Sequence, residues 1–246
     1  MPLKIANRSF APRLFTTLLA ICLMALLIAL GFWQLRRADE KRVLFDGFAR
    51  GQQISRTIDA QTAKVARYSR IEASGHYDGA HQILIDNMID PAGRAGYYVI
   101  TPFALRDGGW LLVNRGWVPL GHSRAERPAI PVPSDERQIR GRADNLPSAG
   151  IQMGVPAALA PPYPIVAAFP KHADLARLLA QPDWTSAADV LLLDADQPDG
   201  YARNWAPPGF APMRHTAYAL QWFALALALF VIYLVTNFRR NHGSVA

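Results

Sequence analysis

The chain contains 246 residues, of which 51% are hydrophobic, and carries a formal net charge of +7 at pH 7. The sequence has no basic stripe interleaved with aromatic residues, so its positive charge does not indicate a nucleic-acid-binding protein. The single cysteine, Cys22, excludes an intramolecular disulfide and any metal site built on a pair of thiolates.

Two apolar runs are each long enough to cross a membrane as a helix. Residues 14–33 and 216–235 are twenty-residue stretches without a charged side chain. A helix of this length crosses a hydrocarbon core about 30 Å thick. An alternative for the first run is a cleaved signal peptide, because residues 29–31 resemble a cleavage site. The run continues beyond that site, so two uncleaved transmembrane helices in contact with lipid are preferred.

The charges near the chain ends indicate the orientation in the membrane. Residues 1–13 and 236–246 carry basic residues and no acid, whereas Arg36 and Arg37 argue for the opposite orientation. Long domains translocate largely regardless of charge, so the acid-free tails receive the greater weight. We predict two cytoplasmic tails and an extracytoplasmic, periplasmic domain over residues 34–215. The lack of an Arg- and Ser-rich presequence favours a bacterial inner membrane.

The first transmembrane helix is predicted to continue as a solvated helical extension over residues 34–51. This segment is rich in strong helix formers. Arg36 and Glu40 stand four residues apart, where opposite charges support a helix.

The next part of the chain contains short runs typical of β-strands. Alternating, β-branched or aromatic stretches predict strands at residues 68–74, 81–87, 97–100, 138–143 and 190–194. Residues 103–118 predict a hairpin, because Asp107-Gly108 is a strong two-residue turn signal between apolar runs.

Helix is sparser in this region, and one short amphipathic helix is predicted over residues 171–180. Pro207, Pro208 and Pro212 precede the second apolar run and are expected to fix its angle of entry. The predicted fold class is a membrane protein with two transmembrane α-helices. These flank a mainly antiparallel β domain, barrel-like or sandwich, that contains one or two helices.

No motif in the chain predicts an enzyme. The six histidines form neither an HxH nor an HExxH pair, and no glycine-rich phosphate loop follows a predicted strand. A binding or assembly function is therefore expected. An extracytoplasmic enzyme anchored by two helices is the less favoured alternative.

The stretch LLVNRGWVP is the most distinctive part of the predicted outer domain. One interpretation is structural, with a bend at Gly116 and Trp117 packed on the core. The other assigns Arg115 and Trp117 to a partner or ligand contact. From the residue types alone, the structural interpretation is favoured.

The second apolar run opens with residues that a lipid-facing helix does not need. His215, Tyr218 and Trp222 stand at i, i+3 and i+7 and therefore share one helix face. Tyrosine and tryptophan at a membrane interface are ordinary anchors, and the residues alone favour this explanation. Alternatively, the His215 imidazole ligates haem iron and the aromatic side chains line the macrocycle.

Several polar residues lie near this face. Haem propionates require cations, and we expect Arg214, Arg36 and Arg37 to cluster at the same membrane surface. Gln221 lies inside the apolar run, where an amide is costly, so Gln34 at the end of the first run is predicted as its partner.

Five stretches distributed over nearly the whole chain are distinctive in combination: GFWQLRRADEK, GHYDGAHQILIDN, GYYVITPFALRDGGWLLVNRGWVP, VLLLDADQPDGYARNW and RHTAYALQWFALA. Together they resemble the Surf1 (Shy1) family of cytochrome c oxidase biogenesis proteins. The middle of the chain departs from many relatives, because PPYPIVAAFPKH lacks their Asn-x-Trp sequence. Any role of this proline-rich region is left open.

The resemblance implies two spans around an extracytoplasmic β-rich domain, and a chaperone that passes haem a to subunit I of cytochrome c oxidase. Other assembly factors are the further expected partners. The family's proposed haem-contacting histidine is matched by His215, and its tyrosine and tryptophan by Tyr218 and Trp222. Its glycine before a Tyr-Asp pair is matched by Gly75, where a structural or partner role is expected. The alternative is a haem-free scaffold that stabilises an assembly intermediate of subunit I.

Overall fold

The computed structural model describes residues 4–5, 8–10, 12–51, 55–59, 61–121, 123–124, 126–148, 159–180, 184 and 187–240. The chain forms two compact units. One consists of Met1–Asp46 together with Pro208–Ala246, and the other of Gly47–Pro207. The first unit contains both apolar runs, and the second contains the β-rich segment.

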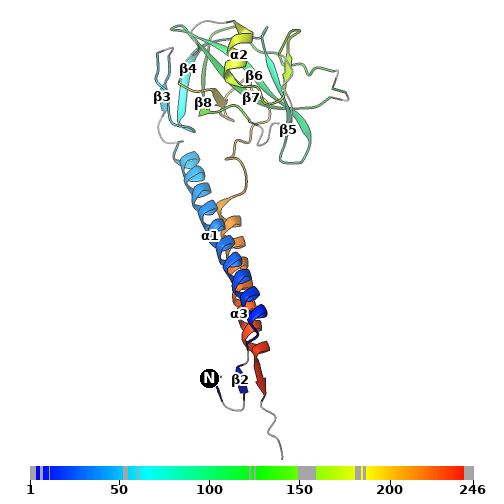
Figure 1. Ribbon diagram of the computed structural model, residues 1–246. Helices are drawn as coiled ribbons and strands as arrows, with labels where there is room; N and C mark the ends of the chain where they lie inside the picture. Colours follow the sequence, from blue (N-terminus) through cyan, green and yellow to red (C-terminus); the bar gives the residue numbers. More distant parts are fainter. Residues whose placement is uncertain are drawn as a thin grey trace, which may run out of the picture. The chain divides into compact units, whose positions relative to one another are not determined.

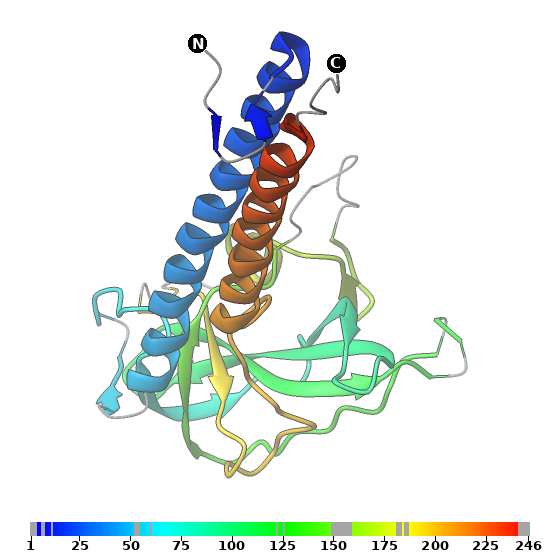
Figure 2. The same cartoon turned by 90° about the horizontal axis from the view of Figure 1, so that it is seen from below.

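Two long helices dominate the first unit. α1 (Leu14–Arg50) and α3 (Pro212–Asn237) are long and apolar enough to cross a membrane, as predicted. They run side by side (Figure 1; Figure 2). Near the chain ends, three short strands form a sheet in the order β1-β2-β11: β1 (Lys4–Ile5), β2 (Arg8–Phe10) and β11 (Phe238–Arg240).

α1 continues without a break to Arg50, which confirms the helical extension predicted beyond the first span. The expected pairing of Arg36 with Glu40 is wrong, because Glu40 bonds Arg37 instead. The observed pair is at i and i+3, where side chains on a helix are also neighbours. The charge pattern therefore supports the helix through a different partner.

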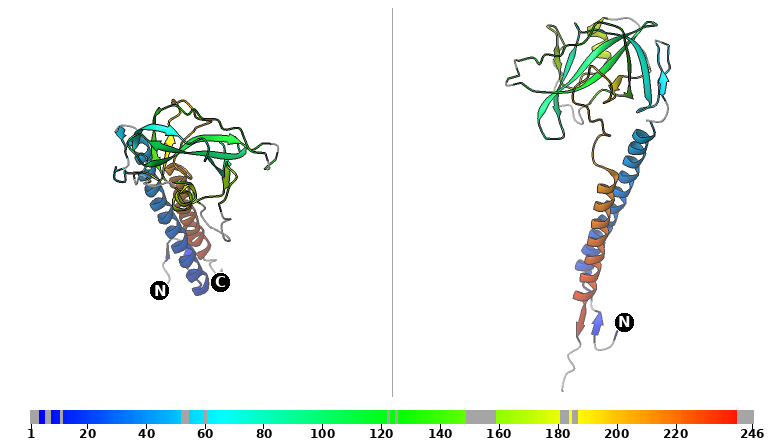
Figure 3. Two further views of the ribbon diagram at one scale, coloured as in Figure 1. Left: turned by 90° about the horizontal axis from the view of Figure 1, so that it is seen from above. Right: turned by 180° about the vertical axis from the view of Figure 1, so that it is seen from behind.

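The second unit is a closed β-barrel. Eight strands form one sheet in the order β3-β4-β8-β10-β7-β6-β5-β9, and a further pairing of β4 with β6 closes a ring (Figure 3). Of the two predicted alternatives, the barrel is observed rather than the sandwich. The strands are β3 (Ser55–Thr57), β4 (Arg70–Tyr77), β5 (Ile83–Ile89), β6 (Ala95–Leu105), β7 (Trp110–Pro119), β8 (Arg137–Asp144), β9 (Ile165–Ala167) and β10 (Val190–Leu193).

The barrel is mainly antiparallel, as predicted. Only the pairs β3–β4, β5–β9 and β7–β10 are parallel among the described strands. The strands predicted from alternation correspond to β4, β5, β8 and β10 with small shifts at their ends. β3 and β9 are too short for their sequences to show a periodic pattern, and β9 follows a run of prolines.

β6 and β7 form the predicted hairpin, with two differences. The strand predicted at residues 97–100 and the first arm of the hairpin are one continuous strand, β6. The predicted two-residue turn is wrong, because residues 106–109 all lie in the loop. Gly108 and Gly109 have positive φ angles of 90° and 86°, which glycine adopts at little cost.

One short helix, α2 (His172–Leu179), confirms the helix predicted over residues 171–180. Leu175 and Leu179 are buried and form its predicted apolar face. The helix ends at Ala180, whose backbone is left-handed and whose N–H bonds the carbonyl of Arg177.

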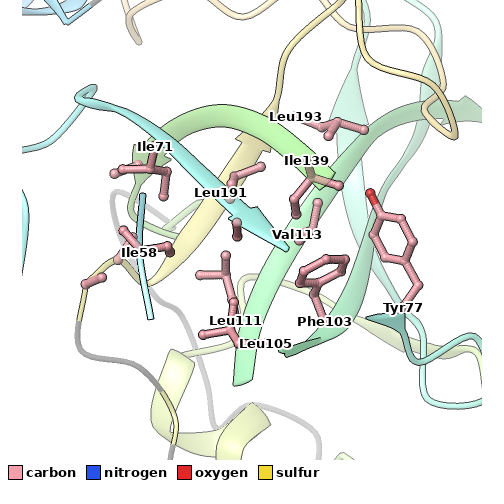
Figure 4. Packing of buried hydrophobic residues seen from close by; sticks show 14 residues of the cluster. Ile58, Ile71, Tyr77, Phe103, Leu105, Leu111, Val113, Ile139, Leu191 and Leu193 are labelled. Atoms are coloured by element: carbon pink, nitrogen blue, oxygen red, sulfur yellow. The ribbon is translucent and has the colours of Figure 1, made fainter. Parts of the chain in front are cut away.

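Buried apolar side chains hold the barrel together. In one cluster Ile71 from β4, Val113 from β7 and Leu191 from β10 come together (Figure 4). A second cluster includes Trp117 and Leu175, so it attaches α2 to the sheet. Each large aliphatic side chain buried in this way stabilises the fold by about 1.5–3 kcal/mol.

Candidate functional site

His215 lies in the first turn of α3. Ala211 precedes the helix with extended backbone, and Pro212 is its first residue. Proline suits this position because its φ is already helical and its missing N–H would have no partner there. The Thr216 hydroxyl donates to the Pro212 carbonyl at 3.3 Å. The proline expected to fix the entry of the second span therefore begins the helix that carries His215.

α1 and α3 pack through small side chains. Gly31 and Ala38 on α1, and Ala219 and Ala226 on α3, are buried and recur at an interval of seven residues. A seven-residue interval keeps a seam on one side of each helix, and small residues let two membrane helices approach closely. A Cβ atom at Gly31 would lie only 2.5 Å from the Phe223 ring.

A hydrogen bond joins His215 to α1 within this helix pair. His215 Nδ1 lies 2.8 Å from Gln34 Oε1. An amide oxygen can only accept, so Nδ1 carries the proton, and Nε2 of the neutral ring keeps its lone pair. Among the described residues no hydrogen bond engages Nε2. The imidazole is therefore held in the tautomer that can ligate a metal through Nε2.

The predicted partnership of Gln221 with Gln34 is wrong. Gln34 bonds His215 instead, and the Gln221 side chain is exposed on the surface of α3. No hydrogen bond to the Gln221 amide is present in the part of the chain that the structure describes. The register and the rotation of α3 decide this outcome, because His215 faces α1 at the level of Gln34, whereas Gln221 lies about 120° further around the helix.

The other predicted residues of the α3 face lie beside His215. Tyr218 is 46% exposed. Trp222 is half-buried, and its Nε1 is buried without an acceptor among the described residues. Arg214 is exposed, with its guanidinium 4.2 Å from the centre of the Phe210 ring. This arrangement places an imidazole, two aromatic rings and a cation on one side of α3.

The two arginines of α1 are not equivalent. Arg37 lies three residues beyond Gln34 and hence about 60° from it around the helix, close to the side that meets α3. Arg36 lies about 200° around the axis from Gln34, on the far side of α1. Both are exposed. Helix geometry therefore places Arg37, but not Arg36, towards the side of α1 that carries Gln34.

Arg115 lies inside the barrel unit and is only 1% exposed. Its guanidinium donates to the carbonyls of Asp199 and Pro131, each at 2.7 Å, and to Gln82 Oε1 at 3.0 Å. Gln82 also accepts from the Thr101 hydroxyl, so it links β6 to this network. A side chain this deeply buried offers no surface to a partner, and its role is to tie loops to the sheet.

Gly116 and Trp117 are also interior residues. Gly116 has a φ of +117°, and a Cβ there would meet the Ala202 carbonyl at 2.8 Å. Trp117 is 6% exposed, and its Nε1 donates to the Met88 carbonyl at 3.1 Å. The structural interpretation of the NRGWVP stretch is the one that this burial supports.

Gly75 stands where the barrel closes. It pairs with Leu105 of β6 on one side and with Arg137 of β8 on the other. A Cβ at Gly75 would lie 1.9 Å from the Ala104 carbonyl oxygen, so no larger residue fits there without movement of the backbone. The residue that the family resemblance singles out is therefore a structural glycine.

Sequence reasoning gave no indication of a cavity at the start of α2. It has a volume of about 260 Å³, and Asn145, Lys171, His172 and Asp189 are among its lining residues. These residues come from three separate segments, so no local sequence pattern could have predicted the cavity. Burial lowers the pKa of His172. Among the described residues no three His, Cys, Asp or Glu side chains gather to hold a metal ion.

Comparisons with known proteins identify a family that matches most of the chain. A family model described as "SURF1 family" matches residues 21–227, a range that includes Gln34 and His215. The "SURF1-like protein" of Rickettsia felis is 30% identical over 237 residues, which cover 94% of this chain and 99% of the relative. That of Rickettsia conorii is 28% identical over 240 residues, covering 94% and 93%. "Surfeit locus protein 1" of Takifugu rubripes is 33% identical over 115 residues, covering 39% and 48%.

Proposed function

Because the chain belongs to the SURF1 family, we propose that it binds haem a through His215 and aids the insertion of this haem into subunit I of cytochrome c oxidase. Family membership implies a role in cytochrome oxidase assembly. The haem-binding step rests on the residues at the start of α3. In this role haem a is cargo that the protein holds and passes on.

The hydrogen bond between His215 and Gln34 is the observation that carries the proposal. Histidines that ligate metals usually donate their other ring N–H to an acceptor, which fixes the tautomer and the ring orientation. The Gln34 amide oxygen, 2.8 Å from Nδ1, fills this role. Haem iron, when bound, would accept the lone pair of Nε2. The donor set therefore fits a haem with one protein ligand.

The neighbouring side chains suit the rest of the macrocycle. Tyr218 and Trp222 offer aromatic surface to a flat apolar ring, and the cation of Arg214 suits its propionates. Arg37 is exposed as well, but it would have to exchange its ion pair with Glu40 for one with a propionate. Among the described residues of the helix pair, His215 is the one histidine that could serve as an axial ligand. A single ligand favours release, which is what a protein that hands haem to an oxidase subunit requires.

The proposed location is the inner membrane of a bacterial cell, with both tails in the cytoplasm and the barrel in the periplasm. The acid-free tails and the two apolar helices support this orientation. Subunit I of the oxidase, other assembly factors and lipid are the proposed partners. Protease added to spheroplasts should cleave the barrel while the tails stay protected, and the reverse pattern would reverse the orientation.

The test is the absorption spectrum of the purified full-length protein from cells that produce haem a. The wild-type protein should show a Soret band, and His215→Ala should lose it together with haem in the oxidase. Gln34→Leu should weaken haem binding by about 10–100-fold, as expected for the loss of a residue that orients a metal ligand. Unchanged haem content in both the purified His215→Ala protein and the oxidase would refute the ligand assignment.

Thr17→Val is the matched control for Gln34→Leu. Thr17 Oγ1 lies 2.8 Å from Tyr233 Oη, so this variant also removes a hydrogen bond between α1 and α3, but at the other end of the helices. It should leave the Soret band unchanged. A wild-type protein that co-purifies with subunit I and never carries haem would support the haem-free scaffold instead.

A further inference from the structure

Three polar residues form a stripe on α3, and two of them, Arg214 and Tyr218, are proposed haem contacts. Arg214, Tyr218 and Gln221 stand at i, i+4 and i+7, a spacing that places them in one stripe along the helix. All three are exposed on the helix pair. The stripe begins beside His215 and extends into the apolar run, so its three side chains lie at increasing depth.

Gln221 is the member of the stripe that the fold does not explain. It lies six residues beyond His215, or about 9 Å further along the helix axis, within the segment predicted to cross the hydrocarbon core. An amide exposed to hydrocarbon is unfavourable unless it forms a hydrogen bond. Gln34, the nearest candidate by sequence, is already bonded to His215. The partner of Gln221 must therefore come from outside the described chain.

Haem a carries a polar group suited to this position. Its two propionates are charged and require the membrane surface, where Arg214 lies, so the opposite edge of the macrocycle must be the deeper one. In haem a that edge bears a hydroxyethylfarnesyl chain, whose hydroxyl stands next to the ring and whose isoprenoid tail suits lipid. Haem o has the same hydroxyl, whereas haem b has a vinyl group in its place.

We propose that the Gln221 side-chain amide hydrogen-bonds the hydroxyl of the hydroxyethylfarnesyl group and thereby selects farnesylated haems over haem b. The inference rests on the proposed haem-binding function and names its specificity-determining residue. Gln221 can donate through its NH₂ or accept through its carbonyl oxygen, so it can form a hydrogen bond with the hydroxyl in either orientation. A ligand without the hydroxyl leaves the amide unpaired in an apolar site, which is how polar sites discriminate strongly.

The experiment compares three haems with the full-length protein in nanodiscs, using the Soret band to measure dissociation constants. Wild type should bind haem a and haem o about tenfold more tightly than haem b, the difference that one such hydrogen bond supplies. Gln221→Leu should raise the dissociation constants for haem a and haem o by that factor and leave the constant for haem b unchanged. Gln34→Leu acts through the iron ligand, so it should raise the dissociation constants for all three haems by the same factor.

Thr236→Val serves as the neutral control. It also removes an exposed polar side chain from α3, but at the far end of the helix. Equal affinity of wild type for the three haems, or a change in Gln221→Leu confined to haem a, would overturn the assignment to the hydroxyl. Unchanged haem binding with loss of a co-purifying subunit would assign Gln221 to a partner helix. Absence of haem binding by wild type would refute the proposed function itself.

Discussion

Replacing Gly75 with alanine tests how the barrel is closed. Gly75 pairs with β6 and β8 at once, and the β4–β6 pairing consists of three residue pairs that begin at this glycine. The added Cβ would lie 1.9 Å from the Ala104 carbonyl oxygen and 2.9 Å from the Phe103 ring. The ring could turn aside, but the carbonyl belongs to the backbone of β6. The strands must therefore separate to admit a methyl group.

The expected loss of stability follows from these contacts. Overpacking of a well-packed interior costs about 1–3 kcal/mol, and more where the obstacle cannot rotate away. Separation of β4 from β6 also weakens the hydrogen bonds of that pairing, each of which contributes about 1 kcal/mol. We expect Gly75→Ala to lower the free energy of unfolding of the barrel by about 3 kcal/mol or more. That is a large share of the roughly 5–15 kcal/mol typical of a domain.

The measurement is denaturant unfolding of the full chain in detergent, followed by tryptophan fluorescence, because Trp110 and Trp117 lie in β7. Gly47→Ala is the matched control. Gly47 lies in α1 with nothing within 4 Å of an added Cβ, and alanine is favoured over glycine in a helix by about 1 kcal/mol. Gly47→Ala should leave the denaturant midpoint of barrel unfolding unchanged or raise it. The same midpoint for Gly75→Ala and wild type would refute the closure argument.

Two further predictions concern buried polar groups. Arg115→Met keeps the side-chain volume but leaves the Asp199 carbonyl without a donor and the Pro131 carbonyl with only the Tyr201 hydroxyl at 3.4 Å, so it should lower the free energy of unfolding by roughly 3 kcal/mol. Arg106→Met, at an exposed ion pair, should change it by less than about 1 kcal/mol, and equal effects would contradict the assignment. Burial lowers the pKa of His172 below 6.5, so the unfolded chain binds that proton more readily and stability should fall as the pH drops below 6.5. His172→Gln should flatten this part of the pH profile of the unfolding midpoint, and an unaltered profile would show that another group titrates.

Local patterns predicted the elements of the fold well, and long-range pairing poorly. An apolar run of membrane length or an alternating strand is determined by neighbours in the sequence, so α1, α3, β4 and β8 were predictable. The β4–β6 closure and the parallel β7–β10 pair join segments far apart in the chain. Nothing in the sequence of one strand specifies such a partner. The barrel and sandwich alternatives therefore could not be separated before the structure.

The candidate site shows the same division. Helical spacing alone places His215, Tyr218 and Trp222 on one face. The partner of Gln34 depends instead on the axial register of α1 against α3, which small buried residues such as Gly31 determine through close packing. Gln221 lies six residues further along α3 and about 120° around its axis from His215, so contact with Gln34 would require both a shift and a rotation of α3.

Two hydrogen bonds join α1 and α3 near opposite ends of the pair. Their separation allows the orientation of the His215 ring to be tested without separating the helices. Thr17 and Gln34 are about 25 Å apart along α1, close to the thickness of the hydrocarbon core, so their bonds to Tyr233 and His215 lie near its two boundaries. Between them the helices meet through small and apolar side chains, which need no hydrogen bond to associate. Gln34→Leu therefore leaves the packed seam and the distant bond in place. It frees only the ring of His215, so a loss of haem in this variant would report the orientation of the ligand rather than separation of the helices.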